Sequence, residues 1–73
     1  MNTWYVTQVQ NFNDGSAQAV ATFGYPTKDV ALSAFYSVMA SSTANDKIAS
    51  VMCVLMNRFG DIDHREFWER QEA

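Results

Sequence analysis

The sequence has few of the features that cross-link a chain, form a membrane span or direct export from the cell. It holds one cysteine in 73 residues, so one molecule cannot form an internal disulfide. Small secreted domains usually depend on such bonds, and their absence favours a reducing compartment. No apolar run approaches the ~18 residues of a membrane span, and no basic and apolar leader opens the chain. We therefore expect a cytoplasmic protein that does not bind a membrane.

Positive charge is also sparse. Five Lys and Arg residues stand against eight Asp and Glu residues, which gives a formal net charge of −3. Proteins that bind nucleic acid cluster their cations, because each neutralised phosphate releases counterions. Here the cations are scattered along the chain, at Lys28, Lys47, Arg58, Arg65 and Arg70. We predict a small acidic protein that binds no nucleic acid.

Proline and glycine are rare, with one and three copies, so few positions interrupt regular structure. Hydrophobic residues make up 48% of the chain, which is enough for a folded core and too much for a disordered segment. The length allows one domain, so we expect residues 1–73 to form a single unit. A core this small stabilises the fold only modestly, and oligomerisation would add to it.

The patterning predicts two strands, a helix and two further strands. Residues 3–10 and 17–25 are rich in β-branched or alternating apolar residues, and an Asp14-Gly15 turn lies between them. Thr27 is placed to cap a helix over residues 28–42, whose apolar stripe recurs every three or four positions. The stripe consists of Ala31, Ala34, Phe35, Val38 and Met39, with Leu32 at its edge. Residues 41–46 are expected to form a polar exit loop.

The segment 47–56 is the clearest strand, and both of its faces are apolar. Residues 64–70 are expected to form the last strand, after a turn at Gly60. We predict an α+β fold in which one helix packs on one face of a four-stranded, mainly antiparallel sheet (ββαββ), with the strand order left open. Cysteine is often fully buried, so we assign Val51, Cys53 and Leu55 to the helix side.

The other side of that strand would then be uncovered. Exposed apolar patches usually mark interfaces, and methionine and aromatic residues suit them. We expect a partner to bind at Met52, Val54, Met56, Trp68 and Tyr5. The first strand contributes either Tyr5 and Val9 or Trp4 and Val6 to this side. The alternative is that the last strand or the tail folds over it.

The chemistry-bearing residues are few. Cys53 lies in an apolar run, where a thiolate is costly, and is better explained as packing. His64 lies among Asp61, Asp63 and Glu66, but their spacing matches no established metal loop, and a solvated acidic turn explains them. The glycines are isolated and form no phosphate-binding loop. We predict no enzyme, no metal and no cofactor.

Three segments carry a resemblance to known proteins: Tyr5-Val6-Thr7, the run from Pro26 to Phe35, and the Phe59-Gly60 turn. With the order of strands and helix, they resemble small uncharacterised proteins of bacterial mobile elements and phages. The resemblance implies an accessory role, such as inhibition of a host defence protein in the manner of anti-CRISPR proteins. It assigns no functional residue, since these proteins share no defining site motif.

The leading hypothesis is a non-enzymatic protein-interaction module, expected to be a homo-oligomer, most simply a homodimer, with a host protein as a further partner. The rival is a small-ligand-binding domain that holds an apolar molecule between helix and sheet, oriented by Tyr36 or His64. A second candidate surface is the uncharged outer face of the helix, made of Ser33, Ser37, Ala40 and Ser41.

Overall fold

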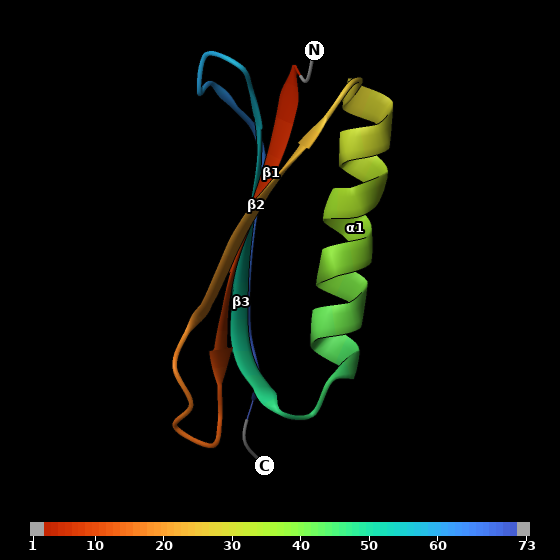
Figure 1. Cartoon of the computed structure of the whole chain (residues 1–73). Coiled ribbons are helices and arrows are strands. Elements are labelled where there is room, and N and C mark those ends of the chain that lie inside the picture. The colour runs from red at the N-terminus through yellow and green to blue at the C-terminus, as the bar shows by residue number, and fades with distance from the viewer. Residues whose placement is uncertain (1–2, 72–73) are drawn as a thin grey trace.

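One helix packs on one side of a single sheet in the computed structural model of the chain, which describes residues 3–71 (Figure 1). The elements follow in the order β1 (Trp4–Phe12), β2 (Ala19–Tyr25), α1 (Lys28–Ala44), β3 (Ile48–Asn57) and β4 (Ile62–Glu69). The predicted ββαββ arrangement is confirmed. Several boundaries differ from the sequence-based prediction by a few residues, because patterns define the centre of an element better than its ends.

The four strands lie in the order β2-β1-β3-β4, and every neighbouring pair is antiparallel. The two hairpins β1–β2 and β3–β4 therefore meet through β1 and β3 at the centre of the sheet. Strands β2 and β3 run in the same direction with β1 between them, so the connection through α1 passes over β1. The helix therefore lies on one side of the sheet (Figure 1) and packs against Val6 of β1 and Cys53 and Leu55 of β3, the two central strands.

Thr27 begins the helix as predicted. Its hydroxyl oxygen accepts a hydrogen bond from the backbone N–H of Val30 at 3.3 Å, and Asp29 lies in the first turn, where it favours the helix dipole. The helix runs through Ala44, and the prediction of an exit loop from residue 41 is wrong at this end. Ser42 belongs to the last turns of the helix and is buried, and its hydroxyl oxygen accepts a hydrogen bond from the side-chain amide of Gln10 at 3.0 Å.

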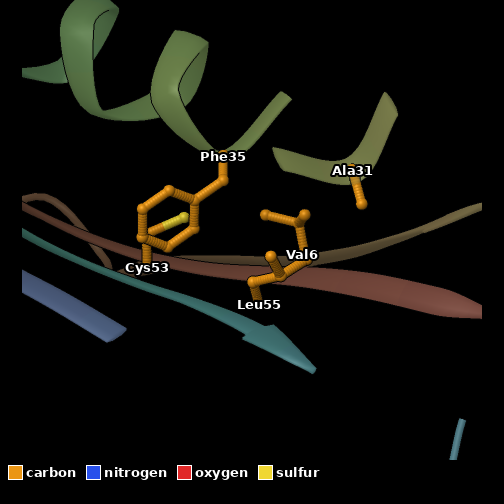
Figure 2. Packing of buried hydrophobic residues seen from close by; sticks show 5 residues of the cluster. All are labelled: Val6, Ala31, Phe35, Cys53 and Leu55. Atoms are coloured by element: carbon orange, nitrogen blue, oxygen red, sulfur yellow. The ribbon is translucent and has the colours of Figure 1, made fainter. Parts of the chain in front are cut away.

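The core lies between α1 and the two central strands. Figure 2 shows Phe35 and Ala31 reaching down from the helix toward Val6 of β1 and Cys53 and Leu55 of β3. These side chains are almost fully buried. The predicted helical stripe is confirmed, since Leu32, Val38 and Met39 of the helix pack partly buried against this cluster and Ala34 is partly buried beside them. Trp4 of β1 and Tyr25 of β2 pack against it from the sheet.

Phe35 fills the centre of this core, and its replacement tests how far the fold depends on it. We expect Phe35→Ala to lower the free energy of unfolding by about 3–5 kcal/mol, because it removes buried contacts and leaves a cavity. Phe59→Ala is the matched control, since Phe59 is 76% exposed and its loss should change stability by less than about 0.5 kcal/mol. Urea unfolding followed by circular dichroism measures both values, and equal losses would contradict this core.

Candidate functional site

The side of the sheet that faces away from α1 is called the open face below. The strand register defines it, because residues paired across neighbouring strands share a face. Tyr5 pairs with Met56, and Val9 pairs with both Met52 and Val20. Met52 pairs in turn with Phe67 of β4. The apolar members of the open face are Tyr5, Val9, Val20, Met52, Val54, Met56, Ile62 and Phe67.

Several of these side chains are strongly exposed. Val20 and Phe67 are each 61% exposed and Ile62 is 56% exposed, while Met52 at the centre is 37% exposed. Tyr5, Val54 and Met56 are partly buried by their neighbours in the sheet. A contiguous apolar surface is unfavourable in water, so such surfaces usually mark a binding site for a partner.

No element within residues 3–71 covers the open face. The helix packs on the opposite side, and β4 lies beside β3 at the edge of the sheet (Figure 1). The alternative that the last strand folds over this face is therefore wrong. The end of the tail, residues 72–73, lies outside the described residues, so the same alternative for the tail stays a prediction. The two hairpin turns bend away from α1, toward the open face, and so lie at its two ends.

The structure brings together four of the five residues predicted to bind a partner. Met52, Val54, Met56 and Tyr5 all lie on the open face. Of the two alternatives for β1, the structure therefore places Tyr5 and Val9 on this face, and Trp4 and Val6 on the helix side. The assignment of Val51, Cys53 and Leu55 to the helix side is confirmed by their burial.

Trp68 was placed on the wrong side by the prediction. It pairs with Val51 and therefore lies on the helix side of the sheet. There the Arg70 guanidinium lies 4.8 Å from the Trp68 ring centroid and donates hydrogen bonds to the backbone oxygens of Ile48 and Asn45. Phe67 takes its place on the open face. Alternation along β4 puts Phe67 and Trp68 on opposite faces, but the register past the bulge at Asp63 decides which of the two faces the helix.

Charge on the sheet is confined to one edge. Strands β1, β2 and β3 contain no Asp, Glu, Lys or Arg, whereas β4 contains four such residues. Two of them, Arg65 and Glu69, pair with Val54 and Ser50 and so belong to the open face. The open face thus carries charge only along its β4 edge, where it has one positive and one negative side chain.

A separate polar cluster forms on the helix side where β4 carries a bulge. Leu55 pairs with His64 and Met56 with Ile62, so Asp63 is the extra residue, and its side chain turns toward the helix. Its carboxylate lies 3.1 Å from the Lys28 ammonium and also bonds to the His64 ring. The hydrogen bond from Lys28 holds the pKa of the Asp63 carboxyl below its ordinary value, with His64 adding to the effect and partial desolvation opposing it.

This cluster ties β4 to the start of α1 and offers little room for a ligand. The His64 ring packs 5.9 Å from the Phe35 centroid and 6.5 Å from that of Tyr36. Within residues 3–71 no pocket is present, and no group of three or more potential metal ligands comes together. Asp61, which the sequence grouped with His64, instead bonds to Asn57 in the β3–β4 turn.

Comparison with known proteins finds no match among family models, curated proteins or solved structures. The resemblance to phage and mobile-element proteins therefore stays a prediction. Across the described part of the chain, no helix combines the length and the apolar character needed to cross a bilayer.

Cys53 is fully buried, and this desolvation raises the pKa of its thiol to about 11. A thiol of that kind is a poor nucleophile at neutral pH, because only the thiolate reacts efficiently. The position under Phe35 agrees with the packing role that the sequence indicated.

The Cys53 pKa predicts how stability changes in alkaline solution. In the unfolded chain the thiol ionises near its ordinary pKa of 9.0, whereas the folded protein retains the proton up to about pH 11. The free energy of unfolding should therefore fall between pH 9 and 11, by roughly 2–3 kcal/mol from this group. Cys53→Ala removes the group, so its unfolding free energy, measured in urea across the same range, should fall less steeply. Parallel pH profiles of the two proteins would contradict the assignment.

Proposed function

We propose that the protein is a non-enzymatic interaction module that acts through the open face of its sheet. The observation that supports this most directly is that both sides of β3 are apolar while the helix covers only one of them. Met52, Val54 and Met56 on the other side lie in the middle of the sheet, where a partner could cover them completely. Covering apolar surface yields about 25 cal/mol per Å² removed from water, before the costs of association.

We further propose that the first partner is a second copy of the same chain. Two sheets can pack face to face about 10 Å apart with their inner side chains interdigitated, as in β-sandwiches. A two-fold arrangement needs a self-complementary surface, and the open face has a charge pattern that fits. Arg65 and Glu69 have opposite signs on one strand, so each can pair with the other in the second copy. The enlarged core would also stabilise a chain of only 73 residues.

The rival, a domain that binds a small apolar ligand between helix and sheet, has less support. Tyr36 and His64 do lie next to each other, but Phe35 occupies the space beneath them. A host defence protein as a further partner, which the phage resemblance implies, stays a prediction without a specific residue to support it.

Charged substitutions on the open face test the proposal. We expect Met52→Lys and Val54→Asp to sediment as smaller assemblies than the wild-type protein, because each places a charge at the centre of the surface buried between two open faces. Ser37→Lys is the control, since Ser37 is exposed on the outer side of α1 and should leave the dimer intact.

Circular dichroism of the same variants separates lost association from lost folding. The proposal predicts that both open-face variants keep the helical and sheet signals of the wild type at low temperature. A monomeric wild type, or open-face variants that assemble as the wild type does, would show that the open face is not an interface between copies, and the proposal would fail.

A further inference from the structure

The two outer strands of the sheet differ in how well they are protected. An edge strand presents unpaired backbone N–H and C=O groups, and natural proteins blunt such edges with charges, prolines or bulges. Strand β4 has four charged residues and the bulge at Asp63. Strand β2 has the sequence AVATFGY, with no charged residue, no proline and a regular register against β1. The β2 edge is therefore open to pairing in a way that the β4 edge is not.

The hydrogen bonds of β2 indicate which backbone groups point outward. The Tyr25 carbonyl accepts a hydrogen bond from the N–H of Thr3 at 3.1 Å, so it points inward, toward the β1 side. Because backbone groups alternate in direction along a strand, those of Val20, Thr22 and Gly24 point to the free edge. The contact of 3.0 Å between the Thr7 and Thr22 hydroxyls agrees, since side chains approach closest at pairs that do not exchange backbone bonds.

We propose that β2 pairs in antiparallel fashion with β2 of a second copy, about a two-fold axis at Thr22. In this register Val20 lies opposite Gly24, Ala21 opposite Phe23, and Ala19 opposite Tyr25. Every cross-chain pair apart from the central threonines thus sets a small residue against a larger one, which lets the two strands approach without steric conflict. The outward N–H and C=O groups of Val20, Thr22 and Gly24 all find partners in the same register.

Charge and exposure favour a second copy over the other possible occupants. A two-fold contact places identical strands together, and β2 has no charge to repel itself, whereas pairing with β4 would set uncharged residues against Asp, Glu and Arg. Phe23 and Val20, which are 52% and 61% exposed, would each gain a cross-chain neighbour. The axis runs perpendicular to the sheet, so both helices lie on one side and both open faces on the other. The contact is therefore separate from the face-to-face association proposed above.

Paired charge substitutions on the helix side of β2 test this register. In A21E/F23E each glutamate would face a glutamate of the second copy, and we expect association through this edge to weaken by at least ~10-fold. In A21K/F23E each lysine would face a glutamate, and we expect most of the affinity to return. Both are to be measured by sedimentation in the Val54→Asp background, where open-face association is removed. Equal affinities of the two variants would overturn the proposed register.

Disulfide trapping gives a second, independent readout. Cys53 is buried, so it should not compete with introduced cysteines. Mixing Ala21→Cys protein with Phe23→Cys protein under mild oxidation should give a disulfide-linked dimer, because these positions face each other across the axis. Each protein alone should give at least ~10-fold less, since Ala21 does not face Ala21 in this register. No excess in the mixture would overturn the proposal, and a result of this kind would leave the open-face proposal untouched.

Discussion

A single helix of 17 residues covers one side of a four-stranded sheet, and this imbalance between the two layers shapes the rest of the molecule. The helix packs over the central strands β1 and β3, where Phe35 contacts Cys53 and Leu55 and leaves almost no exposed surface. The other side of the same strands has a similar apolar composition and no covering layer within residues 3–71. One hydrophobic layer therefore stabilises the fold, and the second is available for association.

The polar contacts of the helix side hold this arrangement in place at both ends. Lys28 at the start of α1 bonds to Asp63, which the bulge in β4 turns toward the helix. Arg70 after β4 bonds to the backbone of Asn45 and Ile48, on either side of the connection from α1 to β3. These contacts attach the edge strand β4 to the helix, while the edge strand β2 is joined to it through residues 26–27 and has no charge.

Much of this fold could be predicted from residue patterns. Alternation along β3 separated its two faces, and the usual burial of cysteine selected the face of Cys53 as the helix side. Thr27 with the stripe around Phe35 identified the start and the buried side of α1. What alternation cannot supply is a bulge, which shifts the register between paired strands. Trp68 lies opposite Val51 because the bulge at Asp63 moves the register of the β3–β4 hairpin by one residue. The burial of Ser42 was missed because it depends on Gln10, 32 residues away in the chain.

The central claim is that the open face is buried by association, and the mass of the wild-type protein in solution tests it most directly. Size-exclusion chromatography with light scattering, across a dilution series, reports this mass without any substitution. The account predicts at least twice the 8.2 kDa of one chain at high concentration, with dissociation toward 8.2 kDa only on dilution. A mass of 8.2 kDa at every concentration would contradict it.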